Sequence, residues 1–389
     1  MSEISAFTGY VYPNETIIPW GILIVLYPYL TGLVAGAFTV SSFYHVFGMQ
    51  QFKPVARLAL LTSLSAMIFV PTPLLLHLGH PERSHLSMIT PHLTSAFAMF
   101  GFFAAFYLLL LTLEVWFVYR ADNVARARSS TGLARKFYRA VTLWSDDVSP
   151  RARVIDSKWL LILAIVGIPS AHGLHGYIGF VFGSLKARHW WESDLMPIIF
   201  LFSAIVSGIA LLIVLYVLSS KLRRVRIDHQ CLKGMIYALW GFLMFTVLLE
   251  GLEFANMVYK GKEGIDTIME YVQGPLFVRY FVLQFGMGAL VPVLVMGIMI
   301  AVNIRGRAFV IGSTISALLV LMNVLLMRWN VVIGGQEISK TGKGLLTYEM
   351  PFWGHESFVS AIVLCIAPFI LLWVLTSLFP PWFDRPGKM

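Results

Sequence analysis

Residues 196–220 read MPIIFLFSAIVSGIALLIVLYVLSS, an apolar run that contains no charged side chain. A helix of about 20 apolar residues crosses the roughly 30 Å hydrocarbon layer of a membrane, so this run is long enough to span it. Further runs of this kind follow one another along the chain, separated by polar breaks. They occupy residues 20–47, 55–78, 94–119, 157–183, 233–258, 277–303, 308–333 and 356–379. The sequence therefore predicts about nine transmembrane helices.

The composition supports the same class of protein. Of the 389 residues, 58% are hydrophobic and 13% are charged, whereas ordinary soluble domains have about 45–50% and about 25%. A net charge of +9 on so apolar a chain indicates basic loops rather than a nucleic-acid partner. We expect an all-α integral membrane protein with a membrane domain over residues 20–379, built as two four-helix bundles and a peripheral helix.

The basic residues alternate between the two sides of the predicted helices. One set of connections holds 20 of the Lys and Arg residues, and the opposite set holds seven. Because basic loops resist translocation, the first set is expected in the cytoplasm. Residues 1–19 are then extracytoplasmic, and residues 380–389 form a cytoplasmic tail. The N-terminus lacks the basic start of a cleavable signal peptide, so we expect the first helix to remain.

Two connections are long enough to have a role of their own. The cytoplasmic connection, residues 120–156, contains GLARKFYRAVTLW at 132–144, whose basic and aromatic residues suit a helix on an anionic membrane surface. A solvated linker is the alternative. The outer connection, residues 334–355, reads GGQEISKTGKGLLTYEMPFWGH, and it is either a docking or site-covering loop or a plain connector.

The cysteine count restricts the cofactors. Only Cys231 and Cys365 are present, so the chain cannot carry a disulfide framework or a cysteine-ligated iron–sulfur cluster of its own.

Polar residues within the predicted helices gather at similar depth. A charged side chain at mid-bilayer costs about 2.5–3.5 kcal/mol even on lenient scales, so such residues are candidates for function. The direction of each helix places the polar residues of six helices in the outer half of the bilayer. These residues are Tyr27, Tyr29, His77, His172, His175, Glu250, Glu253, Asn256, Gln284, Arg328 and Asn330. We expect a shared polar cavity, and separate structural contacts are the alternative.

Several ligands could use such a cavity. A quinone needs an apolar, aromatic-lined cleft with a hydrogen-bonding or proton-exchanging group at each carbonyl, which His together with Glu or Tyr would supply. Two imidazoles and two carboxylates could also bind iron or manganese, and haem b is a rival because it takes axial histidines. However, His172 and His175 share a helix and cannot clasp one haem between them. An ion or solute carrier also needs a polar cavity, although we detect no internal repeat.

Glu114 differs from these residues because it lies in the cytoplasmic half of the third helix, in LLLLTLEVWF at 108–117. It is either a protonated core residue, a neighbour of Arg120, or part of a proton path from the cytoplasm.

Four strings together resemble the NrfD/PsrC family of respiratory membrane subunits. They are PWGILIVLYPYLTGLVAG at 19–36, PLLLHLGHPERS at 73–84, HGLHGYIGFVFGSLKARHWWESDLMPIIFLFSAIVSG at 172–208 and RWNVVIGGQ at 328–336. The resemblance runs from about Pro19 to Pro380 and is closest to the branch of hydrogenase-2-type (HybB) and DsrP-like subunits. His172 and Glu114 match a histidine and an acid of the family, whereas His77 stands where the family usually has Asp.

The resemblance implies a subunit of a quinone-dependent oxidoreductase complex in the cell membrane, rather than an enzyme on its own. It implies menaquinone or another quinone as the redox partner, and no haem or iron–sulfur cluster in this chain. Electrons would pass to or from an extracytoplasmic ferredoxin-like iron–sulfur subunit in anaerobic respiration or sulfur metabolism. A multihaem cytochrome c or a further catalytic or membrane subunit would lie beyond it.

The leading hypothesis assigns roles to individual residues. Quinone binding is assigned to His172, His77, Tyr27, His175, Glu250 and Glu253. Arg328 and Asn330 would neutralise and orient the acids. Glu114 and Glu253 are candidates for a proton path. Partner docking is assigned to Arg83, Lys186, Arg188 and Gln336. The alternatives are an ion or solute transporter and a passive membrane anchor.

Overall fold

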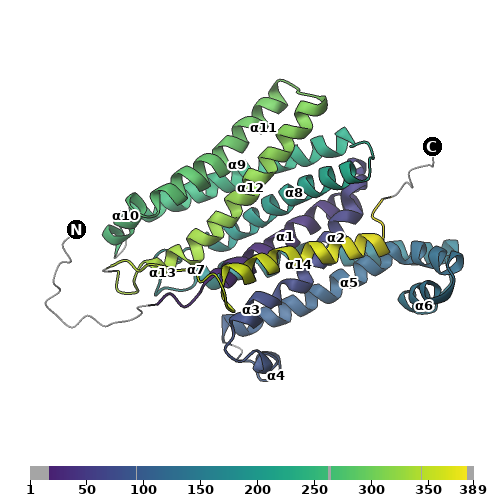
Figure 1. Ribbon diagram of the computed structural model, residues 1–389, viewed down its shortest axis with the longest axis horizontal. Coiled ribbons are helices and arrows are strands. Elements are labelled where there is room, and N and C mark those ends of the chain that lie inside the picture. The colour runs from purple at the N-terminus through teal and green to yellow at the C-terminus, as the bar shows by residue number, and fades with distance from the viewer. Residues whose placement is uncertain (1–16, 93, 262–263, 343, 383–389) are drawn as a thin grey trace.

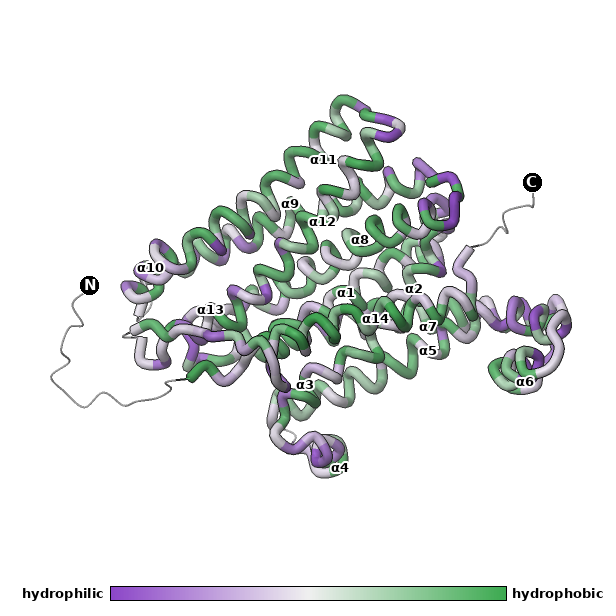
Figure 2. The backbone as a smooth tube through the Cα atoms, viewed as in Figure 1, coloured by the Kyte–Doolittle hydropathy of each residue, from purple (hydrophilic) through white to green (hydrophobic). Residues whose placement is uncertain are grey.

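The computed structural model describes residues 17–92, 94–261, 264–342 and 344–382. Most of the predicted outer segment 1–19 and of the predicted tail 380–389 lies outside these residues. Within the described part of the chain, nine helices are long and apolar enough to cross a membrane. Figure 2 shows hydrophobic residues along the long helices and hydrophilic ones concentrated at their ends. The predicted all-α membrane protein with nine spans is confirmed.

The first half of the chain contributes four spans, of which the second is broken. These helices are α1 (Ile22–His45), α2 (Lys53–Phe69) with α3 (Pro71–His77), α5 (Ala96–Ser129) and α7 (Pro150–Gly183). Pro71 explains the break, because proline cannot donate its backbone nitrogen and clashes with the preceding helical turn. Short helices lie between the spans: η1 (Gln50–Phe52), η2 (Pro81–Arg83), α4 (Leu86–Ile89) and α6 (Gly132–Val141).

The second half contributes five spans. These are α8 (Met196–Leu222), α9 (His229–Lys260), η3 (Val278–Leu290) continuing into α11 (Val291–Ala301), α12 (Gly306–Val332), and α14 (Phe358–Leu378). The short helices are α10 (Ile265–Gln273) and α13 (Gly334–Glu337). α8, which contains the apolar run 196–220, packs against α1, α7, α9 and α12, and α14 packs on α2 (Figure 1). The division into two four-helix bundles stays a prediction.

α1 and α8 approach each other through small residues. Gly32 and Gly36 on α1 face Ala204 and Gly208 on α8, and both pairs are spaced by four. Small residues at this spacing let two helix backbones approach closely in a membrane. The first and second halves of the chain are joined at this crossing.

The connections gather at two ends of the molecule. The connections 46–52, 130–149, 223–228 and 302–305, with the residues after α14, form what we call the basic end. Arg57 pairs there with Asp122 at 2.7 Å, and Arg126 donates to the carbonyl of Leu378 at 2.7 Å. Residues 17–21, 78–95, 184–195, 261–277 and 333–357 form the opposite end, except for those left undescribed. At that end Gln336 exchanges hydrogen bonds with the backbone of Trp20.

The connection expected over residues 120–156 is largely helical. α5 continues to Ser129 and α7 begins at Pro150, so both extend past the predicted span ends. Hydropathy marks where a helix leaves the membrane but not where it ends, because Arg and Ala are good helix formers in water.

Candidate functional site

A π-helix shapes one wall of the candidate site. Residues Val278–Leu290 of η3 adopt this rare conformation, which in other proteins is frequent at functional sites. On this wall lie Tyr280 and Gln284, both buried. A continuous α-helix was expected over residues 277–303, and hydrophobic patterning cannot distinguish the two forms.

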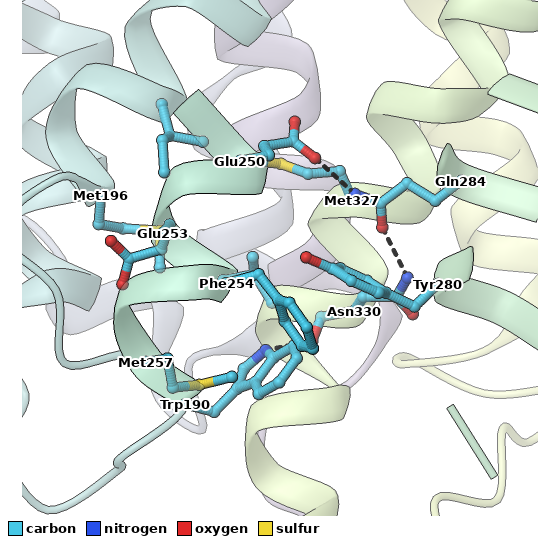
Figure 3. Close-up of a pocket in the computed structure, with 12 residues that line it drawn as sticks. Trp190, Met196, Glu250, Glu253, Phe254, Met257, Tyr280, Gln284, Met327 and Asn330 are labelled. Carbon is cyan, nitrogen blue, oxygen red and sulfur yellow. Dashed lines mark hydrogen bonds between the residues drawn. The ribbon is translucent and has the colours of Figure 1, made fainter. Parts of the chain in front are cut away.

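A cavity opens between α8, α9, η3 and α12. It encloses about 520 Å³ of space not filled by atoms, including its mouth. Its aromatic and thioether walls come from Trp190, Phe254, Tyr280, Met196, Met257 and Met327. Its polar groups are Glu250, Glu253, Gln284 and Asn330 (Figure 3). Predominantly apolar walls with a few converging polar groups are typical of small-molecule sites.

The polar groups form a chain of hydrogen bonds. The Gln284 Nε2 donates to Glu250 Oε2 at 2.8 Å, and the Asn330 Nδ2 donates to Gln284 Oε1 at 2.8 Å (Figure 3). Glu253 Oε2 and Asn330 Oδ1 are enclosed without a hydrogen-bond donor among the described residues. Since unpaired buried acceptors are unfavourable, a ligand that donates hydrogen bonds would be stabilised there.

Glu253 also borders a second hollow of about 500 Å³, including its open part. This hollow is polar and lies toward the opposite end. Its other residues include His189, Glu192, Ser193, Asp194, Asn256 and Lys260. Glu253 thus lies between an apolar cavity and a polar hollow.

Arg328 is completely buried behind the cavity, with 0% of its surface exposed. Its Nη2 donates to Ser203 Oγ at 2.6 Å and lies 2.9 Å from His175 Nε2. Its guanidinium lies 3.8 Å from the ring centroid of Phe200. Because a guanidinium only donates, His175 accepts through Nε2, and the proton of the neutral ring is assigned to Nδ1.

His172 points to a different neighbour. Its Nδ1 lies 2.7 Å from the Ile168 carbonyl, and its Nε2 lies 3.1 Å from Thr39 Oγ1 on α1. His172 therefore faces α1, while His175 faces α8 and α12, although only three residues separate them.

His77 and Tyr27 lie near the start of α1. His77 Nδ1 lies 2.5 Å from Glu356 Oε1 in the connection before α14. In the same connection, the Tyr348 hydroxyl accepts from the backbone nitrogen of Ile22 at 3.1 Å, and burial raises the Tyr348 pKa. Tyr27 packs edge-on against Phe100. His77, Tyr27 and His172 do not line the cavity. The polar residues of the six helices are therefore divided between this cavity and separate groups of contacts.

Glu114 is buried in α5, and its Oε2 has no hydrogen-bond partner in the part of the chain that the structure describes. The hydroxyl of Tyr107, two turns away on the same helix, is in the same situation. The proton-path role of Glu114 stays a prediction.

The four predicted docking residues differ in exposure. Arg83 and Lys186 are exposed at the opposite end. Arg188 is buried and donates to the Ile338 carbonyl at 3.0 Å. Gln336 is buried against Trp20. The last two side chains hold the opposite end together, and all four docking assignments stay predictions.

Sequence reasoning missed part of the site. Trp190, Phe254 and Tyr280 form cavity walls, but aromatic residues are frequent within membrane helices and near their ends, so none of the three carried a signal. Gln284 was recognised by its depth but received no role. Among the described residues, no group of three or more His, Cys, Asp or Glu side chains could hold a metal ion.

Within the residues described, nine membrane-length helices and a cavity with a polar wall between α8, α9, η3 and α12 define a polytopic membrane protein with a candidate ligand site. Residues 12–339 match the family described as polysulphide reductase, NrfD. The chain belongs to this family, which confirms the resemblance seen in the sequence.

Several curated proteins are similar to this chain. The chain is 33% identical to a selenate reductase subunit of Mesobacillus selenatarsenatis over 85% of this chain and 75% of the relative. It is 28% identical to a putative dimethyl sulfoxide reductase membrane subunit of Halobacterium salinarum, over 72% and 62% respectively. It is 21% identical to an Hdr-like menaquinol oxidoreductase integral membrane subunit of Archaeoglobus fulgidus, over 61% and 52%.

Proposed function

We propose that this chain is the quinone-reactive membrane subunit of an oxidoreductase complex. It exchanges electrons between a menaquinone-type quinone and an iron–sulfur subunit docked at the opposite end. The names of its relatives support this proposal, since they are subunits of selenate and dimethyl sulfoxide reductases and of a menaquinol oxidoreductase.

The cavity between α8, α9, η3 and α12 is the observation that carries the proposal. Its aromatic and methionine walls suit a flat ring and an isoprenoid tail. The unpaired oxygens of Glu253 and Asn330 suit the two hydroxyl groups of a quinol, which donate hydrogen bonds. The amide of Gln284, fixed by Glu250 and Asn330, holds the polar wall rigid.

Glu253 is the residue we assign to proton exchange. Oxidation of a quinol releases two electrons and two protons, and the electrons leave one at a time to an iron–sulfur carrier. A carboxylate at the ring takes a proton, and the polar hollow behind Glu253 leads it away. In the direction of quinone reduction the same groups deliver protons.

The basic end indicates how the chain is oriented in the membrane. If the connections with 20 Lys and Arg face the cytoplasm, the cavity and Trp190 lie toward the outer face. The partner then docks at the opposite end, where Arg83 and Lys186 are exposed. Arg188 and Gln336 act there by holding the connection that the partner meets.

The histidines take supporting roles in this proposal. His175 and Arg328 join α7 to α12 beside the cavity through their hydrogen bond. His172, His77 and Tyr27 belong to a second position along α1, where a quinone would bind if the cavity is not the site. Glu114 would feed protons from the basic end.

Photolabelling of the full chain in lipid nanodiscs with an azido-quinone tests the position of the ring. The proposal expects labelled peptides from 250–257 and 278–290. Labelling confined to α1 and α7 around His172 would move the site to the second position. Labelling at the basic end would refute the outer site.

Turnover of the assembled complex with menaquinol tests the role of Glu253. Glu253→Gln should lower turnover by about 10²-fold or more, the usual contribution of a general base, with little change in quinone affinity. Glu270→Gln is the matched control, because Glu270 is an exposed acid on α10 at the same end. Equal turnover in both variants would contradict the assignment, and quinone-independent electron transfer would favour a passive anchor.

A further inference from the structure

Helix length indicates that the end of α6 lies near the level of a membrane surface. The Trp116 indole nitrogen on α5 donates to the carbonyl of Val141, the last residue of α6, at 2.7 Å. Trp116 lies 20 residues after Ala96, where α5 begins, which corresponds to about 30 Å of helix and hence one hydrocarbon thickness. Trp159 on α7 is exposed and lies 24 residues before Gly183, where α7 ends, which corresponds to about 36 Å of helix. Figure 1 shows α6 set off from the long helices at this end.

Three arginines of α5 hold α6 and the segment that follows it. Arg120 donates to the Asp147 carbonyl at 2.8 Å, and Arg128 donates to the Asp146 carbonyl at 2.7 Å. Arg126 donates to the Tyr138 hydroxyl at 3.0 Å. The segment is therefore held against α5, and its outward side chains have fixed positions.

A strained turn presents two large apolar side chains at this level. Leu143 and Trp144 both have left-handed backbone conformations, with φ of 52° and 56°, which L residues seldom adopt. They are 70% and 67% exposed. Tryptophan is enriched at membrane interfaces because its ring is apolar and its nitrogen donates. The turn would expose these side chains to water if no lipid were present.

Basic side chains line the adjacent face of α6. Arg135 and Arg139 are four residues apart and Lys136 is between them, so all three lie on one side of the helix. The described residues provide none of the three with an ion-pair partner. The enclosed Nε of Arg139 also lacks a hydrogen-bond acceptor among them. The exposed Leu133 and Phe137 form the apolar face beside this basic one.

We propose that the α6 segment, residues 132–144, is a binding site for anionic phospholipid headgroups. Leu143 and Trp144 insert among the outermost acyl carbons. Arg135, Lys136 and Arg139 bind the phosphates, because basic residues near a surface are attracted to anionic lipid. A membrane occupant is favoured over a protein partner because the turn lies at the hydrocarbon boundary and its charges complement the lipid. The proposal does not depend on quinone binding.

Lipid preference of the purified full chain tests the basic face. Native mass spectrometry would measure the binding of phosphatidylglycerol and of phosphatidylcholine to two proteins. One is the unaltered chain, and the other combines Arg135→Ser, Lys136→Ser and Arg139→Ser. Removing a basic residue near an anionic surface lowers affinity roughly fivefold, so the preference for phosphatidylglycerol should fall on the order of 100-fold. A preference equal to that of the unaltered chain would overturn the proposal.

A second variant tests whether the lipid preference comes from a local site on α6 or from the overall positive charge of the basic end. Lys221→Ser, Arg224→Ser and Arg226→Ser combined remove the same charge from another connection at the basic end. This control should retain most of the preference. An equal loss in both variants would show that no site resides on α6. Arg139 is half-buried and the other five substituted side chains are exposed. Gel filtration with thermal unfolding therefore checks the folding of both variants.

Fluorescence in nanodiscs tests the insertion of the turn. The difference between the unaltered chain and Trp144→Phe isolates the emission of Trp144. Lipids brominated near the headgroup end of the acyl chain should quench this emission, and aqueous iodide should not. Quenching by iodide alone would overturn the proposal, as would protection that appears only when other subunits of the complex are bound.

Discussion

The crossing of α1 and α8 should tolerate no additional carbon at Gly36. A Cβ built on Gly36 lies 2.2 Å from the Ala204 carbonyl oxygen and 2.7 Å from the Gly208 Cα. Ordinary contact begins at 3.4 Å, so Gly36→Ala would force the helices apart by about 1 Å at this point. The atoms in the way are backbone, so no side-chain rotation relieves the clash.

Two opposing terms set the expected size of the effect. A gap of 0.5–1 Å forfeits about a quarter to a half of each van der Waals contact across the crossing. Overpacking of this kind destabilises proteins by about 1–3 kcal/mol. Alanine is the better helix former by about 1 kcal/mol, which offsets part of the loss. Because backbone blocks backbone here, we expect a net loss of about 2 kcal/mol.

Gly173 on α7 provides the matched control, because a Cβ added there meets no atom within 4 Å. Gly173→Ala keeps the gain in helix propensity and should be neutral or up to about 1 kcal/mol more stable. Reversible unfolding of the full chain in mixed dodecylmaltoside and dodecyl sulfate micelles, followed by tryptophan fluorescence, measures both variants. If the two variants shift the midpoint equally, or Gly36→Ala is as stable as the unaltered chain, the close crossing is refuted.

Three further predictions concern polar residues. Arg328→Met should destabilise the chain by about 1–3 kcal/mol, because it removes the donor to His175 and Ser203 and leaves both acceptors buried; the same unfolding assay measures the loss, and an unchanged midpoint would contradict it. His77→Ala should change stability by less than about 1 kcal/mol, since the pair with Glu356 is partly exposed, yet it should speed hydrogen exchange in residues 346–356. Glu114→Gln should lower turnover-linked proton uptake in proteoliposomes, and unchanged uptake at normal turnover would exclude Glu114 from a proton path.

The fold was largely predictable because membrane thickness limits it strongly. A run such as 196–220 admits one structure in lipid, since every backbone group must be paired within the segment. The π-helix at Val278–Leu290 was not predictable, because an apolar segment of this length has the same hydropathy whether it forms a π-helix or an α-helix. The extension of α5 to Ser129 was missed for a related reason, because hydropathy falls at the membrane surface while the helix continues.

The candidate site was only partly predictable, because the sequence indicates how deep a residue lies in the membrane but not which way its side chain points. Depth correctly brought together Glu250, Gln284 and Asn330, which the structure joins by hydrogen bonds. Depth also grouped His172 with His175, but these residues point to α1 and to Arg328 respectively. Which way a side chain points depends on how helices rotate and pack, and that information is distributed over all the neighbouring helices.

The two acids of α9 illustrate what the geometry adds. They lie one turn apart, and sequence alone gives them the same role. Glu250 accepts a hydrogen bond from Gln284, which in turn accepts from Asn330, so permanent partners fix its position. Glu253 has an enclosed oxygen without a donor among the described residues and borders both the apolar cavity and the polar hollow. A group that exchanges protons must gain and lose a partner in each cycle, which an acid held by permanent partners cannot do readily. Glu253 is therefore the acid whose substitution should affect turnover, and Glu250 the acid whose substitution should affect stability.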